Sequence, residues 1–454
     1  MAKNALHSSL ERAKVYHPKH FDMLRSDSQS GAIPPEEAWR RIAAQLPAFA
    51  NLPKAQIGRR AALGRTLSAE LVAAVDVPAA DVSAMDGFAY AGNQVVGTRL
   101  AILGTVRAGD PPDRTERAEI PSHAAGGWKI MTGAPLPRGM DRVIPVEQIL
   151  FDGGFVELRH AAASGDHIRR RGEVVRVGSP LLRTGAALTP GALALLATHG
   201  FAEIEVVRPP RVAILTTGDE VVPPESTPAS GQLRDSHTDF LLAATQTLGI
   251  QALPLGIAPD RKEDLRKGIA RGLESDVLLL CGGVSAGEFD FVEEVLSEFE
   301  CTPQFDAVAI QPGKPLVFAV APASEGRPPT LIFGLPGNPA SVMVSFWLFV
   351  RPTLRRLLGS EDAFWRGTVR GTLAAPLPAA PPRDRILPAE IEYRAEGLFV
   401  HPLAVKGSHD LSAYARGTAL VRLRVGEGPI AAGQQCEVLP LADWRGVPEL
   451  SSPR

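Results

Sequence analysis

Four short segments, all with glycine and three of them with acidic residues, each follow an apolar run that is typical of a buried strand. They are residues 216–220 (TTGDE), 256–260 (GIAPD), 282–290 (GGVSAGEFD) and 334–339 (GLPGNP). The carboxyl ends of parallel strands meet at one edge of a sheet, where the ligands of such sheets bind. We therefore expect the glycines and the acids of these segments to line one site. The acids are Asp219, Glu220, Asp260, Glu288 and Asp290.

The chemistry of a site at this edge of the sheet depends on its glycines and its acidic residues. Glycine-rich turns expose backbone N–H groups that hold anions at helix N-termini. Carboxylates would repel a bare anion unless a divalent cation lies between them, and sites made of oxygen ligands suit Mg²⁺ with a phosphorylated ligand. Two plainer interpretations stay open: the glycines only permit tight turns, and Asp260 and Asp290 only cap the helices that follow them. Lys314, in residues 311–315 (QPGKP), either meets an anion or is a solvated lysine of a loop.

A second cluster of candidate residues lies earlier in the chain. Asp86 precedes a glycine in residues 82–90 (VSAMDGFAY), and Thr132 does so in residues 129–137 (KIMTGAPLP). Taken singly, both are ordinary turn residues. Residues 168–173 (IRRRGE) place three arginines in a row. This run is either a solvated basic face or part of a wall that binds anions, since arginine suits bidentate phosphate contacts.

The elements that must position these residues follow from the hydrophobic pattern. Between residues 211 and 359, apolar strands alternate with helices, which predicts a largely parallel sheet, and we expect a hairpin over residues 305–320. Helices are also predicted from Pro34 onward and over residues 58–74, where leucines recur at spacings of four. Short apolar runs between glycine and proline turns predict β structure over residues 90–159 and after residue 359.

The composition excludes several classes of protein. The 454 residues carry a formal net charge of −2, which argues against nucleic-acid binding as the main role. The 3 cysteines form no CxxC pair, so a cysteine-rich zinc site or a disulfide framework is not expected. The apolar stretch at residues 340–350 is too short to cross a bilayer, and no signal-peptide pattern opens the chain. We expect a soluble, cytoplasmic protein without a membrane segment.

The ordered set of motifs resembles one family, the molybdopterin molybdenumtransferases (MoeA and the E domain of gephyrin). The motifs are SAMDGFA, IMTGAPLP, IRRRGE, VAILTTGDE, CGGVSAGEFD, QPGKP and GLPGNPAS, in this order along the chain. Single motifs of this kind are weak signals, but seven in the family's order are a strong one. The resemblance runs from about residue 34 to residue 441.

The resemblance implies a multidomain α/β plus β fold and a homodimer. Its parts would be a molybdopterin-binding α/β domain with a mostly parallel sheet, a β-rich module, an elongated domain assembled from two segments, and a small C-terminal β domain. The predicted boundaries are residues 1–32 for a flexible N-terminal extension, 33–75 with 165–210 for the two-segment domain, 76–164 for the β-rich module, 211–359 for the α/β domain and 360–454 for the C-terminal domain.

The resemblance also implies an activity. The substrate would be adenylylated molybdopterin, which the family cleaves with Mg²⁺ to release AMP while it inserts molybdate, or tungstate, into the dithiolene. Apo-molybdoenzymes and the adenylylating enzyme are possible further partners. The implied site is a cleft between the α/β domain of one subunit and the β-rich module of the other.

The family's functional positions transfer to this sequence residue by residue. The implied catalytic residues are Asp86, Thr132, Glu220, Asp290 and Lys314. The implied substrate-binding residues are Asp260, Gly282, Gly283, Ser285, Pro336, Gly337, Asn338 and Pro339. The implied Mg²⁺ ligands are Glu220, Asp260 and Asp290.

The sequence departs from the family pattern at three positions. Ala307 and Gln311 stand where the family has two further lysines, and Val174 stands where an acid follows the arginine run. The lost lysines would contact the anionic substrate, and a hydrogen bond to a charged group contributes about 1.5–3 kcal/mol. The alternative is therefore a non-catalytic paralogue that binds molybdopterin or the finished cofactor as a carrier, a sensor or a scaffold.

Overall fold

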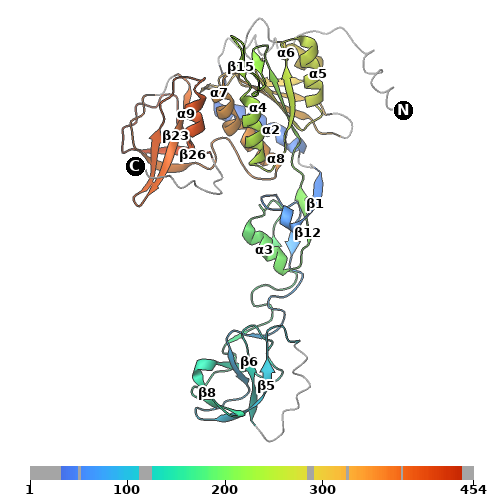
Figure 1. Ribbon diagram of the computed structural model, residues 1–454, viewed down its shortest axis with the longest axis vertical. Helices are drawn as coiled ribbons and strands as arrows, with labels where there is room; N and C mark the ends of the chain where they lie inside the picture. The colour runs from blue at the N-terminus through green and yellow to red at the C-terminus, as the bar shows by residue number, and fades with distance from the viewer. Residues whose placement is uncertain are drawn as a thin grey trace, which may run out of the picture. The chain divides into compact units, whose positions relative to one another are not determined.

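The computed structural model describes residues 32–49, 53–111, 125–283, 291–323, 327–379 and 382–441 of the chain. By its internal contacts the chain divides into two compact units. The first unit comprises Met1–Ala55, Gly64–Thr66 and Val207–Arg454, and the second comprises Gln56–Leu63 and Leu67–Val206. The second unit is thus inserted into the sequence of the first, as the colours of Figure 1 show. The predicted N-terminal extension lies outside the described residues except for its last residue.

The α/β domain of the first unit contains a six-stranded sheet with the order β16-β13-β17-β21-β20-β18. Its strands are β13 (Val212–Thr217), β16 (Leu253–Ala258), β17 (Val277–Cys281), β18 (Thr302–Phe305), β20 (Val317–Ala321) and β21 (Thr330–Leu335). The sheet is mostly parallel, as predicted, and β20 runs antiparallel to both of its neighbours. The predicted hairpin is correct only in that β18 pairs with β20, because the strand between them, β19 (Ile310–Gln311), joins a different sheet.

Helices cover both faces of this sheet. They are α4 (His237–Gln246), α5 (Lys262–Gly272), α6 (Val292–Glu298), α7 (Pro339–Ser345) and α8 (Arg351–Leu357), with a π-helical turn over Phe346–Val350 between the last two. Alternate residues of β13 enter different cores: Val212 and Ile214 pack with α4, α7 and α8, and Ala213 and Leu215 pack with α5 and α6. Because both faces are covered, every residue of the strand is buried and its first four are apolar, as is typical of parallel sheets.

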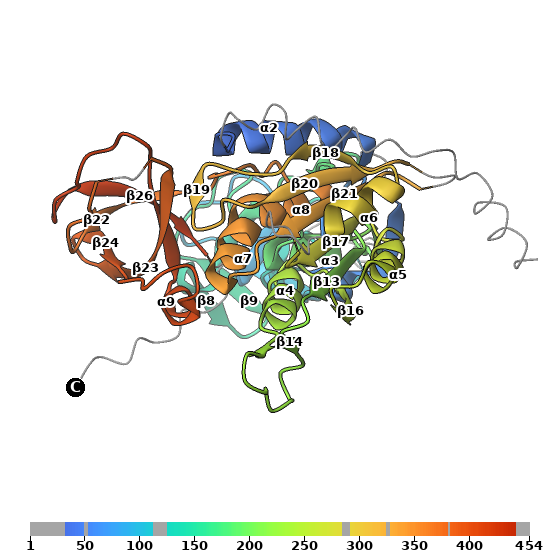
Figure 2. The same cartoon turned by 90° about the horizontal axis from the view of Figure 1, so that it is seen from above.

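The first described helix, α2 (Pro35–Gln45), belongs to the same domain. It begins after Pro34, as predicted, and carries Glu36 and Glu37 in its first turn. Its apolar face and the turn after it, at Ile42 and Phe49, lie in the core that α4, α7 and α8 share. The assignment of this helix to the two-segment domain was therefore wrong, because its apolar stripe is buried against the α/β sheet. Figure 2 shows α2 running alongside β18.

The helix predicted over residues 58–74 is also wrong. This stretch contains the end of β1 (Lys54–Gly58), a 3₁₀ turn (Arg59–Ala61) and β2 (Leu71–Val72). Gly64 has a φ of +75°, which does not fit a right-handed helix. The backbone N–H of Leu67 instead donates to the carbonyl of Ala186, so a distant segment replaces the helical hydrogen bonds.

The C-terminal domain of the first unit is a six-stranded sheet with the order β19-β23-β24-β22-β26-β25, which an additional pairing of β23 with β25 closes on itself. Its longer elements are β22 (Val369–Leu373), β23 (Asp384–Arg394), β24 (Gly397–Pro402), α9 (Leu411–Arg416), β25 (Ala419–Leu423) and β26 (Gln435–Pro440). Figure 2 shows β19 between this sheet and the α/β domain. The two domains of the first unit are therefore joined by strand pairing.

The second unit contains the predicted β-rich sheet, with the order β7-β4-β6-β5-β9-β8. Its strands are β4 (Gly87–Tyr90), β5 (Arg99–Val106), β6 (Gly126–Ile130), β7 (Arg142–Pro145), β8 (Ile149–Asp152) and β9 (Phe155–Leu158), with a 3₁₀ turn at Val146–Gln148. Three short strand pairs join the segment before this sheet to the segment after it. They are β1 with β12 (Glu203–Val207), β2 with β11 (Pro180–Leu182), and β3 (Val82–Ser83) with β10 (Ile168–Arg169).

Helix α3 (Pro190–Thr198) lies between β11 and β12 in the sequence and has a capping residue at each end. The Thr189 hydroxyl accepts a hydrogen bond from the N–H of Ala192, and Gly200 has a φ of +78° after the last turn. Within the described ranges, no helix combines the length and the apolar character that a bilayer span requires. The other predicted domain boundaries stay predictions.

Gly87 is the position of the β-rich sheet where a side chain fits worst. A Cβ atom there would lie 2.0 Å from the carbonyl oxygen of Ile144, on the paired strand β7. We expect Gly87→Ala to lower the free energy of unfolding by about 1–3 kcal/mol, as overpacking does. Urea unfolding of the full chain measures this. Gly154→Ala is the matched control, because its Cβ meets nothing within 4 Å, and equal midpoints for the two variants would contradict the prediction.

Candidate functional site

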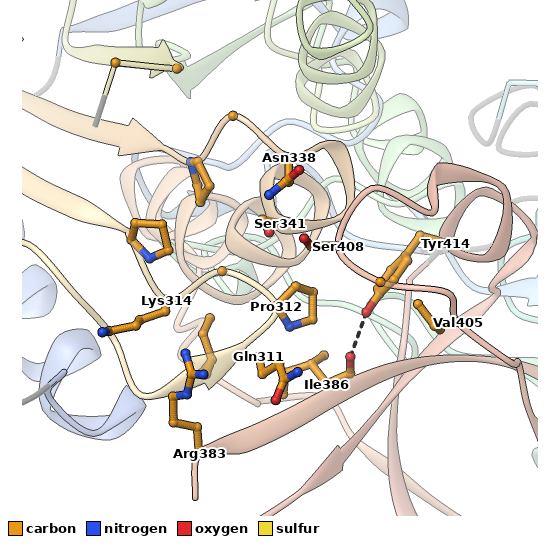
Figure 3. Close-up of a pocket in the computed structure, with 18 of the residues that line it drawn as sticks. Gln311, Pro312, Lys314, Asn338, Ser341, Arg383, Ile386, Val405, Ser408 and Tyr414 are labelled. Carbon is orange, nitrogen blue, oxygen red and sulfur yellow. Dashed lines mark hydrogen bonds between the residues drawn. The ribbon is translucent and has the colours of Figure 1, made fainter. Parts of the chain in front are cut away.

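A pocket of about 620 Å³ lies in the first unit, between the α/β domain and the C-terminal domain (Figure 3). From the α/β domain it is lined by Thr217, Gly218, Glu220, Leu233, Asp260, Gly282, Gly283, Ile310, Gln311, Pro312, Gly313, Lys314, Pro315, Pro336, Gly337, Asn338 and Ser341. From the C-terminal domain it is lined by Arg383, Arg385, Ile386, Leu387, Val405, Gly407, Ser408 and Tyr414. We refer to this cavity as the pocket.

The α/β side of the pocket is built from the segments that follow the parallel strands. Those after β13, β16, β17 and β21 all contribute, as expected for the carboxyl edge of such a sheet. Glycine is required at two of these turns. Gly218 has a φ of +137°, and Gly282 has a φ of +90° with its Cβ position 2.7 Å from the carbonyl oxygen of Thr217. Close packing of the turns brings the acids together.

Most of the predicted residues of the first unit line this pocket. They are Glu220, Asp260, Gly282, Gly283, Lys314, Pro336, Gly337 and Asn338. Pro339 is the first residue of α7 and directly follows Asn338. Ser285, Glu288 and Asp290 lie outside the described residues, so their predicted roles stay predictions.

Two carboxylates that follow β13 and β16, Glu220 and Asp260, line the pocket, whereas the neighbouring Asp219, which was expected at the same site, is not among its lining residues. The N–H of Asp260 donates to the Asp219 carboxylate at 3.2 Å, and the N–H of Asp219 approaches the Asp260 carboxylate at 3.4 Å. Burial raises the pKa of Asp260, and the negative charges of Asp219 and Glu220 add to the rise, against the lowering effect of the hydrogen bond. The arrangement crowds like charges, which a bound cation would relieve. Asp260 is not the N-cap of α5. Arg261 takes that position, and no side chain makes a capping hydrogen bond there.

The donor set fits Mg²⁺ in chemical type. Glu220 and Asp260 offer oxygen ligands, which Mg²⁺ prefers. Among the residues that the structure describes, no three acidic, histidine or cysteine side chains form a ready metal cluster. The third predicted ligand, Asp290, is not among them.

The pocket also holds three cations, two of which sequence reasoning missed. Lys314 follows β19, and Arg383 and Arg385 lie at the start of β23. None of the three forms an ion pair with a carboxylate of the described chain. Figure 3 shows the Arg383 side chain rising toward the segment that carries Gln311 and Lys314. The arginines stand in residues 383–385 (RDR), but no sequence pattern there indicates a place in this site.

Tyr414, a residue of α9, forms part of the pocket wall on the side of the C-terminal domain. Its hydroxyl donates to the carbonyl of Ile386 at 2.8 Å, drawn as a dashed line in Figure 3, and its ring is buried. Burial raises its pKa, so the phenol stays protonated. The N–H of Ala340 donates to the carbonyl of Ser408 at 3.2 Å, which ties the start of α7 to the same wall. The pocket is thus bounded by fixed backbone on its C-terminal side.

Asp86 and Thr132 come together in the second unit. Asp86 precedes β4 and Thr132 follows β6, and the pairing of Gly87 with Ile130 brings the two ends side by side. The Asp86 carboxylate accepts hydrogen bonds from the Thr132 N–H at 2.6 Å and from its hydroxyl at 2.9 Å. These two bonds, the backbone one first, lower the pKa of Asp86. The pair is exposed, and its carboxylate is held ionised.

Two arginines of the basic run are engaged by carboxylates of the same unit. Arg170 pairs with Asp81 at 2.7 Å, and Arg171 pairs with Asp76 at 2.6 Å. The backbone bond from Val177 and the bond from Arg171 lower the pKa of Asp76. These contacts favour a structural role for the run over a wall of free cations. Val174 is exposed.

Loss of the Thr132 hydroxyl should raise the pKa of Asp86. Thr132→Val removes the side-chain donor and keeps the stronger backbone one, so the pKa moves only part of the way back to its ordinary value. Carboxyl-carbon NMR titration of the full chain measures this shift, with Asp86→Asn identifying the resonance. Thr105→Val, on the exposed side of β5, is the control, and an unchanged Asp86 titration in Thr132→Val would contradict the assigned bond.

Comparison with known proteins covers most of the chain. Residues 33–200 match the family model of the MoeA N-terminal region (domain I and II), residues 213–356 match the "Probable molybdopterin binding domain", and residues 370–441 match the MoeA C-terminal region (domain IV). The three models together span the described domains of both units.

Individual relatives agree with the family models. The molybdopterin molybdenumtransferase of Synechococcus elongatus is 37% identical over 322 residues, covering 68% of this chain and 76% of the relative. That of Haemophilus influenzae is 32% identical over 386 residues, covering 84% and 92%. The solved MoeA protein of Pyrococcus horikoshii matches with a TM-score of 0.73 at 27% identity, covering 91% of this chain and 100% of that one. The chain therefore belongs to the MoeA family of molybdopterin molybdenumtransferases.

Proposed function

We propose that this protein inserts molybdate, or tungstate, into adenylylated molybdopterin with Mg²⁺-dependent release of AMP. Its relatives are named for molybdenum transfer to molybdopterin, which makes a transferase of molybdenum cofactor biosynthesis the starting point. The observation that carries the proposal is the pocket, which combines carboxylates at the carboxyl edge of a parallel sheet with three cations that pair with no carboxylate among the residues the structure describes. The combination suits a substrate with a phosphoric anhydride and a second, separate anion.

The acidic part of the pocket would receive the adenylylated end of the substrate. Glu220 and Asp260, with Asp290, would hold Mg²⁺, which supplies charge neutralisation for the phosphates when bound. The backbone N–H groups of the turns at Gly283 and Gly337 would orient the phosphate oxygens. Positioning and charge neutralisation are the main requirements of attack on such an anhydride, so no protein nucleophile is needed.

The cationic part would hold the oxyanion. Lys314, Arg383 and Arg385 offer one ammonium and two guanidinium groups, and guanidinium groups match the oxygens of tetrahedral anions in pairs. Molybdate and tungstate have similar size and charge, so the same groups would accept both. Ser408 and Tyr414 would limit the size of the anion.

The second unit would act on the same substrate in an assembled homodimer. Asp86 is held ionised by Thr132 and is exposed, so it is available to a partner molecule. In the proposed enzyme this carboxylate would meet the substrate from the β-rich module of the other subunit. The enzyme would work in the cytoplasm and pass its product to apo-molybdoenzymes.

One observation favours a second candidate function, that of a non-catalytic carrier or sensor of the cofactor. Gln311 lines the pocket as a neutral amide, and Ala307 offers no charge in the same segment. Such a protein would bind molybdopterin tightly without cleaving its adenylyl group.

An assay of the purified protein separates the two functions. The full chain is incubated with adenylylated molybdopterin, Mg²⁺ and either molybdate or tungstate, and AMP release is followed beside reconstitution of an apo-molybdoenzyme. Oxyanion-dependent AMP release with active cofactor supports the insertase, and the preferred oxyanion identifies the metal. Binding without AMP release supports the carrier.

Lys314→Gln should weaken the oxyanion dependence of AMP release. A hydrogen bond to a charged group contributes about 1.5–3 kcal/mol, so the molybdate concentration for half-maximal rate should rise about tenfold or more. Lys267→Gln, an exposed lysine on α5, is the control and should behave as the wild type. If both variants keep the wild-type dependence on molybdate, Lys314 does not hold the anion.

A further inference from the structure

The start of β23 carries three charged residues in a row, and they do not share one environment. Arg383 and Arg385 line the pocket and are half-buried, whereas Asp384 between them is 5% exposed. Successive side chains of a strand point to opposite faces. The two arginines therefore face the pocket, and the carboxylate between them points into the protein.

Asp384 is held from two sides. Its carboxylate accepts hydrogen bonds from the Arg422 guanidinium, at 2.6 Å from Nε, and from the N–H of Val425 at 2.9 Å. Its own N–H donates to the carbonyl of Ala309 at 3.0 Å, next to β19. In the parallel pairing of β19 with β23, Ile310 is the partner of Asp384 and Gln311 is the partner of Arg385.

Arg422 is also held by several contacts. Its side chain is 5% exposed, and a second bond joins it to Glu36 of α2 at 2.5 Å. The guanidinium lies 4.8 Å from the ring centroid of Phe364 and 5.9 Å from that of Trp365. The planar guanidinium group, with two carboxylates and two aromatic rings around it, has few alternative orientations.

Stability alone does not account for a buried ion pair here. Well-packed apolar residues of the same volume often stabilise a protein as well as a buried pair does. The pair does, however, specify which residue of the strand points inward. A slip of β23 by one residue would turn Arg383 and Arg385 into the core and bring the Asp384 carboxylate into the pocket, where it would repel an anion.

We propose that the buried Asp384–Arg422 pair is a positioning device that fixes the register of β23 and thereby sets the affinity of the pocket for a tetrahedral oxyanion. The inference rests on the proposed function only for the identity of that anion. Asp384 and Arg422 touch no substrate in this scheme and act through Arg383 and Arg385. Glu36 also holds Arg422 and so connects the pair to helix α2.

The test compares two buried aspartates of the same unit. Asp276 is 1% exposed, pairs with Arg208 at 3.0 Å and with Arg211 at 3.3 Å, and does not line the pocket. Asp384→Asn and Asp276→Asn each remove one buried charge beside an arginine and keep the side-chain shape. We expect both variants to lower the Tm of the full chain by similar amounts.

Calorimetric titration with molybdate alone, and separately with sulfate, gives the decisive readout. Asp384→Asn should weaken the binding of both anions at least tenfold, and Asp276→Asn should bind them as the wild type does. The affinity for AMP should stay within twofold in both variants, which a general loss of structure would not allow. If Asp384→Asn does not fold, Arg422→Lys keeps the positive charge without the planar fork and should weaken anion binding at least threefold.

Three results would overturn the inference. They are wild-type anion affinity in a folded Asp384→Asn or Arg422→Lys variant, an equal loss in Asp276→Asn, and no binding of either anion by the wild-type protein. A wild-type protein that binds both anions but releases no AMP in the insertase assay refutes the proposed function. The positioning role then still stands if Asp384→Asn weakens anion binding and Asp276→Asn does not.

Discussion

Two residues of the α/β domain, Ile310 and Gln311, form a strand in the sheet of another domain, and the pocket depends on this pairing. The backbone of β19 bonds to the start of β23, which brings Lys314 from one domain beside Arg383 and Arg385 from the other. The same two domains are also joined by the bond from Ala340 to Ser408 and by an apolar core that includes Ile386 and Tyr414. A ladder of backbone bonds is directional, so it sets the distance between the two walls more firmly than side-chain contacts would.

The pocket is electrically divided, and this division constrains what it can bind. Glu220 and Asp260 crowd negative charge at the end of the parallel sheet, and burial raises the pKa of Asp260. The cations gather at the other domain and at the segment after β19. A ligand that is complementary to both parts must carry a cation-bridged anion at one end and a free anion at the other.

The sequence was sufficient to predict site residues where the local motifs and the strand topology lead to the same place. The glycine and acid motifs lie at the ends of buried strands, and strand topology brings Glu220, Asp260 and Gly282 to one edge. The sequence was insufficient where contacts with a distant segment determine the local structure. Leucines at spacings of four near Leu67 suggested a helix, but Gly64 and a bond to Ala186 impose a different path. Arg383 and Arg385 acquire their role from the pairing with β19, which no local pattern encodes.

Helix α2 has a consequence for the order in which the chain acquires structure during synthesis. Its apolar face, at Ala38 and Ile42, is buried against strands that begin only at Val212, after the whole inserted unit. At about 5–20 residues per second, roughly 10–30 s pass between emergence of the helix and of its first partner strand. The inserted unit can fold in that interval, while the face of α2 waits for its partners. Until those strands emerge, the apolar residues of this segment stay exposed on the ribosome-bound chain.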